Sequence, residues 1–319
     1  MNIGIITGAS SGMGKEFVKL TMQNHLDLDE IWVIARRKER LEAWPSLYKE
    51  QKFRILPLDL QKKEDVECLK QILEETQPHI ELFVHCAGFG IMGKIQDISM
   101  EEQAEMVDVN CRSVVEISSL LLPYMKYRGR MIYMASAAAF LPQPGFAVYA
   151  ASKAFVLSYV RALRAENRER QLRVTAVCPG AVKTEFFNRA LTKKHLPAYK
   201  KLVMADPKKV IKKAWKDNEQ NKEISVYGKA IKLTHLVTKI LPLTIRCFWQ
   251  YCVRYSISDC GSRITRCFPL QSITTSPCAS DSAVIYESSL IRMPVLAIVC
   301  KIAQRRSSPR PRAALTNFW

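Results

Sequence analysis

The sequence predicts a three-layer α/β domain, in which a doubly wound parallel sheet lies between two layers of helices. Residues 2–180 alternate short apolar runs with amphipathic stretches, a pattern typical of repeated strand–helix units. Apolar runs such as Ile31–Ala35 are almost continuous, which is typical of strands buried on both faces. Together these two observations favour one sheet that helices cover on both sides.

Seven segments have the length and composition of strands, and the gaps between the first six leave room for crossover helices. The predicted strands are Asn2–Thr7, Glu30–Ala35, Arg54–Asp59, Leu82–Cys86, Arg130–Ala135, Arg173–Cys178 and Glu223–Tyr227. Helical periodicity predicts helices at Gly14–Gln23, Lys62–Glu75, Met100–Lys126 and Tyr149–Glu169. The last strand is expected to close one edge of the sheet.

We assign residues 1–256 to this single domain. Within it, the basic and helical stretch at about 185–221 is expected to form a small lid over the substrate pocket. Residues 229–255 have an apolar stripe beside lysines, which suits packing against the domain or a second subunit, with peripheral membrane contact as the alternative. Residues 257–319 are basic, rich in Ser and Cys and without periodicity, which predicts an irregular, disordered tail.

The composition excludes a wholly disordered chain and a polytopic membrane protein. Of the 319 residues, 48% are hydrophobic and 24% are charged, as in ordinary globular proteins. The strand-like run Ile3–Ile6 follows Met1 and Asn2 directly, so we expect no targeting peptide and a cytoplasmic location. The ten cysteines contain no CxxC pair, which indicates neither a zinc site nor a disulfide framework.

The formal net charge of +18 is the extreme value in the composition. Nucleic acid, an anionic membrane surface and an anionic small molecule all attract such a charge. No helix-turn-helix, zinc-finger or aromatic RNA-binding motif accompanies it, so we expect no nucleic-acid partner. We favour a basic surface that also attracts a phosphorylated cofactor.

A glycine-rich turn joins the first predicted strand to the first helix, with Gly8, Gly12 and Gly14 in the run Thr-Gly-Ala-Ser-Ser-Gly-Met-Gly. Glycine permits unusual backbone angles and lets a pyrophosphate approach the backbone closely. The positive end of the helix then faces the phosphate charge. The position between a strand and a helix therefore predicts a dinucleotide-binding turn.

Arg36 and Arg37 directly follow the second predicted strand, which ends at Ala35. A site that prefers NAD has an acidic residue near this position to bind the ribose 2′-hydroxyl, and this chain has none at the strand end. Arginine binds a 2′-phosphate through its planar fork. The two arginines therefore favour NADP(H), although the run continues to Lys38 and Arg40 and also suits a solvated basic loop.

Tyr149 and Lys153 are four residues apart in a predicted helix, so both face the same side. A phenol with a pKa of about 10 is a poor base at neutral pH. An ammonium group at ~4 Å would lower that pKa by roughly three units, at an effective dielectric constant of ~20. The pair therefore indicates a tyrosine that takes part in proton transfer.

The glycine turn, Asn110, Ser136, the Tyr149–Lys153 pair and Pro179-Gly180 follow one another in one order. In this combination the chain resembles the short-chain dehydrogenase/reductase family, over roughly Asn2–Tyr255. The resemblance implies a Rossmann fold, an NADP-dependent oxidoreductase acting on a CH–OH group, and a homo-oligomer. It implies hydride transfer between NADP(H) and a carbonyl or alcohol carbon of a small molecule.

The resemblance also implies roles for single residues. Tyr149 matches the general acid/base, Lys153 the residue that lowers the tyrosine pKa, and Ser136 the group that binds the substrate oxygen. Asn110 matches the asparagine that holds a water of the proton relay. The positions implied to bind the cofactor are Gly8, Ser10, Ser11, Gly12, Met13, Gly14, Arg36, Arg37, Asp59, Ala87, Gly88, Asn110, Tyr149, Lys153, Pro179, Gly180, Val182 and Thr184.

One position departs from the family pattern, because Cys86 stands where the family has the Asn of Asn-Ala-Gly. The resemblance implies that this asparagine stabilises the sheet and the nearby loop. Its loss therefore places the rigidity of the loop in question more than the chemistry. We interpret Cys86 as a buried space-filling residue.

Five aromatic residues are expected near the substrate, because they lie in or beside loops at the carboxyl edge of the sheet. They are Phe89, Phe140, Phe146, Phe186 and Phe187. They favour an apolar lipid-like, steroid-like or aromatic carbonyl compound, and packing of the loops is the alternative. Two other functions stay open: a non-catalytic NADP(H) sensor and a membrane-surface reductase of lipid carbonyls.

Overall fold

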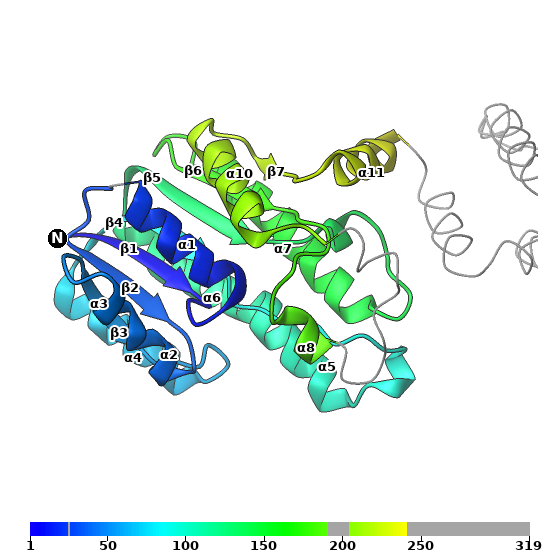
Figure 1. The fold of residues 1–319 in the computed structure, drawn as a ribbon, viewed down its shortest axis with the longest axis horizontal. Coiled ribbons are helices and arrows are strands. Elements are labelled where there is room, and N and C mark those ends of the chain that lie inside the picture. Colours follow the sequence, from blue (N-terminus) through cyan, green and yellow to red (C-terminus); the bar gives the residue numbers. More distant parts are fainter. Residues whose placement is uncertain (25, 191–203, 241–319) are drawn as a thin grey trace, which may run out of the picture. The chain divides into compact units, whose positions relative to one another are not determined.

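The computed structural model describes residues 1–24, 26–190 and 204–240, and in this part a parallel sheet of seven strands confirms the predicted doubly wound architecture (Figure 1). The strands are β1 (Asn2–Thr7), β2 (Glu30–Ile34), β3 (Lys52–Leu56), β4 (His79–His85), β5 (Met125–Met134), β6 (Arg173–Val177) and β7 (Ile224–Ser225). Their order in the sheet is β3-β2-β1-β4-β5-β6-β7. The direction of winding reverses between β1 and β4, where ligands bind in sheets of this kind.

Helices cover both faces of this sheet. The α-helices of the described residues, including those at the ends of the domain, are α1 (Gly12–Gln23), α2 (Lys38–Leu41), α3 (Ala43–Leu47), α4 (Lys63–Thr76), α5 (Met100–Val107), α6 (Ser113–Leu121), α7 (Ala147–Glu166), α8 (Phe186–Ala190), α10 (Pro207–Glu219) and α11 (Lys229–Ile240). One apolar core lies between the sheet and helices α4, α6 and α7. A second core lies on the other face, where α1 and α10 are side by side (Figure 1). The three layers are therefore those expected.

The prediction of one regular helix over Met100–Lys126 is wrong in two ways. The helix is interrupted, and it ends earlier than predicted. Helix α5 passes into a π-helical turn at Asp108–Arg112, and α6 then ends at Leu121. Pro123 follows in a short 3-10 turn and lacks the N–H that a longer helix would need. Met125 and Lys126 belong instead to β5.

The basic stretch expected to form a lid divides into parts with different surroundings. Residues 191–203 lie outside the described residues. Helix α10 belongs to the core rather than to a lid, because Val210, Ile211 and Trp215 are buried against α1 and the sheet. Helix α8 remains near the predicted substrate pocket, since Phe186 packs against Tyr149.

Helix α11 packs on the domain with one face. A Cβ atom built on Gly180 would lie 2.9 Å from the Cδ1 atom of Ile231, and the His235 ring stacks on Phe140 at 4.4 Å. Leu233 and Leu236 are exposed. Within the described ranges, no helix is long and apolar enough to cross a membrane. The rest of the predicted amphipathic segment and the tail at 257–319 lie outside these ranges.

Candidate active site

The predicted site residues come together because their loops leave the same edge of the sheet. Parallel strands place all of their carboxyl ends at one edge, and the segments after β1, β2, β3, β4, β5 and β6 each carry site residues. Tyr149 and Lys153 lie in the first two turns of α7, which follows β5. Asn110 lies in the π-helical turn between α5 and α6.

The glycine turn after β1 depends on the absence of side chains. Gly8 and Gly12 have φ angles of +66° and +52°, a region that side chains disfavour. A Cβ atom on Gly14 would lie 2.2 Å from the carbonyl oxygen of Gly8, so only glycine lets α1 begin this close to β1. The turn therefore presents bare backbone at the amino end of α1, which suits a phosphate group.

Thr7 anchors the loop that contains Cys86. Its hydroxyl oxygen accepts hydrogen bonds from the backbone N–H groups of Cys86 and Ala87, both at 3.1 Å. These bonds join the end of β1 to the end of β4. The loop with Cys86 therefore keeps an anchor. Cys86 is partly buried rather than fully buried, and burial raises the pKa of its thiol.

Arg37 reaches back over the glycine turn. Its Nη2 atom donates to the hydroxyl oxygens of Ser10 at 3.1 Å and Ser11 at 2.8 Å, and its Nε atom also donates to Ser10. Its Nη1 atom forms an ion pair with Glu185 at 3.2 Å. Arg36, beside it, is exposed. The structure thus brings Arg37, Ser10 and Ser11 into one polar cluster.

Glu185, in the segment after β6, also belongs to this cluster. It accepts hydrogen bonds from Arg40 at 2.8 and 2.9 Å. These bonds, with those from Arg37, lower the pKa of the Glu185 carboxyl group against the opposing effect of burial. The sequence reasoning missed Glu185, and its place directly after Thr184 is the signal that could have identified it.

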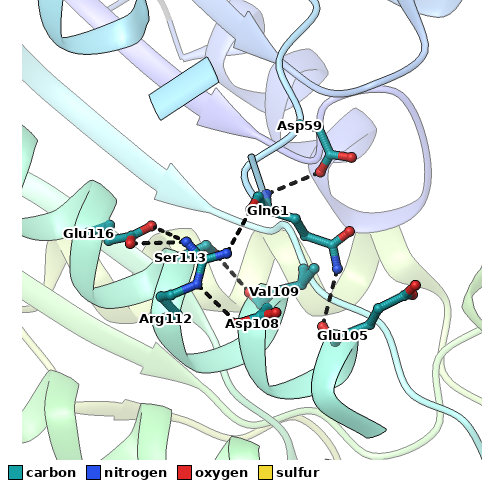
Figure 2. Close-up of polar contacts among 8 residues, drawn as sticks. All are labelled: Asp59, Gln61, Glu105, Asp108, Val109, Arg112, Ser113 and Glu116. Atoms are coloured by element: carbon teal, nitrogen blue, oxygen red, sulfur yellow. Dashed lines mark hydrogen bonds and ion pairs between the residues drawn. The ribbon is translucent and has the colours of Figure 1, made fainter. Parts of the chain in front are cut away.

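The loop with Asp59 is tied to the helices by Arg112. The Nη2 atom of Arg112 donates to the carbonyl oxygen of Gln61 at 2.7 Å, while its other nitrogens bind Asp108 and Glu116 (Figure 2). The backbone N–H of Gln61 in turn donates to Asp59 at 3.2 Å. Asp59 therefore sits in a braced loop just beyond the end of β3, rather than inside the strand.

Asn110 is fully buried and positions two other segments of the site. Its side chain donates to the carbonyl oxygen of Phe89 at 2.8 Å and to the hydroxyl of Ser152 at 3.0 Å, and it accepts from the N–H of Phe89 at 3.1 Å. A Cβ atom on Gly88 would lie 2.9 Å from the Asn110 Oδ1 atom and 3.1 Å from the Lys153 Nζ atom. Gly88, Asn110 and Lys153 therefore meet at one point.

Tyr149, Ser136 and Lys153 are also brought together. Tyr149 is 8% exposed and hydrogen-bonds with Ser136, whose hydroxyl also accepts from the N–H of Ala138. The Lys153 Nζ atom lies 5.9 Å from the centre of the Tyr149 ring. It donates to the carbonyl oxygen of Met134 at 2.9 Å. The lysine is therefore near the tyrosine ring while bonding to the end of β5.

The pKa of Tyr149 differs from the simple expectation. Burial raises it to about 12, and the hydrogen bond with Ser136 opposes this rise. Burial also lowers the pKa of Lys153 to about 8. Burial dominates because both groups lose their hydration, so the attraction between ammonium and phenolate does not by itself yield an acidic phenol here.

An apolar wall surrounds the Tyr149 ring. Phe146 stacks on it with ring centres 4.2 Å apart, and Phe186 lies at 5.4 Å. A Cβ atom on Gly90 would lie 2.6 Å from the Tyr149 Cδ2 atom, so Gly90 makes room for the ring. The sequence reasoning missed Gly90, for which the only signal was a second glycine two residues after Gly88.

Phe89, Phe146, Phe186 and Phe187 belong to one apolar cluster with Tyr149. Phe140 lies elsewhere, because it stacks on His235 of α11. Four of the five aromatic residues predicted near the substrate therefore lie together, and Phe140 does not.

The segment after β6 lies beside the glycine turn. The carbonyl oxygen of Pro179 accepts a hydrogen bond from the N–H of Ala137 at 2.9 Å, which links it to the Ser136 loop. Val182 is buried and forms a β-bridge with Ala205. A Cβ atom on Gly12 would lie 3.5 Å from the Cβ atom of Thr184. Thr184 thus lies across from the turn expected to hold the pyrophosphate.

The family model for short chain dehydrogenases matches residues 2–195, which is more than half of the chain. The chain belongs to the short-chain dehydrogenase family. It is therefore an oxidoreductase with a nucleotide-binding Rossmann fold, as the residue pattern predicted.

Relatives of this short-chain dehydrogenase are similar over most of their lengths. An uncharacterised oxidoreductase of Staphylococcus aureus is 26% identical over 226 residues, which cover 70% of this chain and 94% of that protein. A short-chain dehydrogenase from Sphingobium yanoikuyae, solved with NADPH, is 23% identical with a TM-score of 0.65, and the match covers 75% of this chain and 93% of that one. One from Burkholderia phymatum, solved with NAD, is 19% identical with a TM-score of 0.63, covering 74% and 92%. The two structures support the fold.

Proposed function

We propose that this dehydrogenase interconverts a carbonyl compound and an alcohol with NADP(H), and that Tyr149 is its general acid/base. The observation that carries the proposal is the convergence of Tyr149, Ser136 and Lys153 at the sheet edge that also holds the glycine turn. A phenol, a hydroxyl and an ammonium group at one place suit proton transfer to an oxygen next to a hydride acceptor.

The residues around the turn fit a dinucleotide with a 2′-phosphate. The bare backbone at Gly14 leaves space that a Cβ atom would fill, and the amino end of α1 faces it. Arg37, Ser10 and Ser11 already form a donor cluster beside the end of β2, where this chain has no acid. When bound, the cofactor supplies or accepts the hydride.

The protein supplies the proton and holds the reacting oxygen. With a pKa raised to about 12, Tyr149 is protonated at neutral pH and is ready to donate its proton to a carbonyl oxygen. Ser136 can hydrogen-bond the same oxygen as negative charge develops there. Lys153, with a pKa lowered to about 8, can release and regain a proton close to neutral pH.

The substrate in this proposal is apolar near its carbonyl group. The tyrosine lies among Phe146, Phe186 and other buried apolar residues, and ligand pockets of this kind combine apolar walls with few polar groups. An aromatic, steroid-like or lipid-like ketone therefore suits the site better than a short polar one.

The test is a screen of NADPH oxidation by the purified full chain over ketones, aldehydes, steroids and acyl compounds. We expect turnover with bulky apolar ketones and little with small polar ones. Binding of NADPH without turnover of any compound would instead favour the non-catalytic sensor. Equal turnover of polar and apolar ketones would contradict the substrate class alone.

Replacing Glu185 with glutamine is expected to strengthen NADPH binding. The Glu185 carboxylate pairs with Arg37, which is proposed to bind the 2′-phosphate, so it competes with that phosphate. Because this ion pair is exposed, the gain is expected to be roughly two- to five-fold in Kd, with little change for NADH. Fluorescence titration with both cofactors measures it.

The matched control is Glu42→Gln, which removes a nearby exposed carboxylate that pairs with Lys38. It should leave the ratio of NADPH to NADH affinity unchanged. Weaker NADPH binding in Glu185→Gln would contradict competition and would show that Glu185 orients the arginines instead.

A further inference from the structure

We propose that a second anion-binding site, for a small ligand with several phosphate groups, lies at the edge of the sheet opposite Tyr149. A pocket there has a volume of about 460 Å³, within the range of ligand pockets. Its polar lining residues are Arg128, Arg164, Arg168, Arg173, Gln171 and Asn221. No acidic side chain lines this pocket, whose lining lies wholly within the described residues.

The pocket is separate from the candidate active site. Arg173 is the first residue of β6, and Arg164 lies near the carboxyl end of α7, whereas Lys153 lies near its amino end. At 1.5 Å per residue, the 11 residues from Lys153 to Arg164 span roughly 16 Å of helix. The pocket therefore lies near the amino ends of the strands, away from the edge that holds the glycine turn.

The backbone around the pocket is held in an unusual conformation. Arg128, Gln171 and Asn221 have φ angles of 62°, 51° and 53°, a region that residues with side chains seldom adopt. The N–H of Arg128 donates to the carbonyl oxygen of Arg170, and its Nε atom donates to Gln171 at 2.8 Å. These contacts fix the direction of the Arg128 guanidinium before any ligand binds.

Structural roles account for Arg128 and Arg164 but not for Arg168 and Arg173. Arg164 donates to the carbonyl oxygen of Val174 at 3.1 Å and to the side-chain oxygen of Asn221 at 2.7 Å, and a cation near a helix carboxyl end is stabilising. Arg168 and Arg173 form no side-chain hydrogen bond or ion pair with any part of the chain that the structure describes.

Four guanidinium groups around one pocket repel one another unless an anion lies between them. The planar fork of arginine matches the oxygens of a phosphate group, and it forms shorter and stronger bonds with an anion than with a neutral acceptor. An anion with two or more phosphates can contact several of the arginines together, which one phosphate cannot. The geometry therefore favours a multiply phosphorylated ligand.

The test is isothermal titration calorimetry of the full chain with inorganic tripolyphosphate at fixed ionic strength. We expect a site, in addition to any binding at the glycine turn, whose affinity falls at least about ten-fold in the double variant Arg168→Ala/Arg173→Ala, because each lost bond is charge-assisted. Orthophosphate should bind much more weakly than tripolyphosphate. The single variant Arg168→Gln should also weaken binding. Because Arg168 is exposed, this variant should fold normally even if the double variant does not.

Two controls separate this site from other basic surfaces. Lys49→Ala/Lys52→Ala removes two exposed charges near the far edge strand, β3, and should change the affinity less than two-fold. Arg37→Ala removes the proposed 2′-phosphate contact and should leave tripolyphosphate binding at this second site intact. Unchanged affinity in the Arg168 and Arg173 variants, equal loss in the lysine control, or loss of binding at this second site in Arg37→Ala would overturn the proposal.

Discussion

Replacing Tyr149 with phenylalanine is expected to lower kcat/KM for carbonyl reduction by roughly 10²- to 10⁴-fold, the usual contribution of a general acid. The ring would keep its stacking contacts with Phe146 and Phe186, so the apolar wall should persist. Only the proton donor and the hydrogen bond with Ser136 are removed. NADPH affinity should therefore stay within about two-fold of the original value, since binding of the phosphates does not use this hydroxyl.

The matched control is Tyr133→Phe. Tyr133 is fully buried in β5 and hydrogen-bonds with Ser118 at 2.8 Å, outside the candidate active site. Loss of this buried hydrogen bond should lower the free energy of unfolding by about 1 kcal/mol and leave turnover intact. Near-normal turnover in Tyr149→Phe across the ketone screen would refute the assigned role.

The pH dependence of the reverse reaction gives a second measurement on Tyr149. Alcohol oxidation needs the phenolate as the base, and burial raises the pKa of Tyr149 to about 12. Below that pKa the phenolate fraction grows about ten-fold for each unit of pH, so the oxidation rate should rise as pH rises. Carbonyl reduction uses the protonated phenol and should not show this rise.

The double variant Arg36→Asp/Arg37→Ala is expected to lower kcat/KM with NADPH by roughly 10- to 100-fold, because charge-assisted hydrogen bonds to the 2′-phosphate are lost. The activity with NADH should be kept or improved, since a carboxylate at the end of β2 can accept hydrogen bonds from ribose hydroxyls. Steady-state kinetics with both cofactors measure the change in preference. Folding should be little affected, because both arginines are exposed.

The matched control for this variant is Arg40→Ala. Arg40 is exposed and pairs with Glu185, and it makes no contact with Ser10 or Ser11 in the described structure. Its removal should change the cofactor preference far less than removal of Arg37. If the ratio of NADPH to NADH activity were the same in the double variant as in the original chain, the arginine assignment would be refuted.

Much of the fold was predictable from local sequence patterns. Apolar runs located the strands to within a few residues, and Asn2–Thr7 was predicted with its observed bounds. Errors arose where local signals were weak or in conflict. The helix predicted at Met100–Lys126 continued past Pro123, because the apolar residues after it suit both a helix and the β5 strand.

The parts of the candidate site that depend on short local motifs were predictable. The turn with Gly8 and Gly14, and the spacing of Tyr149 and Lys153, were visible in the sequence because both depend on local geometry. Thr7 and Gly90 were missed, since their roles depend on segments distant in the chain that fold against them.

Local sequence patterns were enough to predict the order of strands and helices along the chain, the family, and which residue types meet at the carboxyl edge of the sheet. Those features follow from the periodicity of apolar residues and from short motifs, which act over a few residues. Three features follow from the folded chain alone: the pairing of Glu185 with Arg37, the burial that raises the pKa of Tyr149, and the pocket of arginines at the opposite edge. Desolvation and charge clustering depend on residues far apart in the chain, so they arise only when the chain has folded.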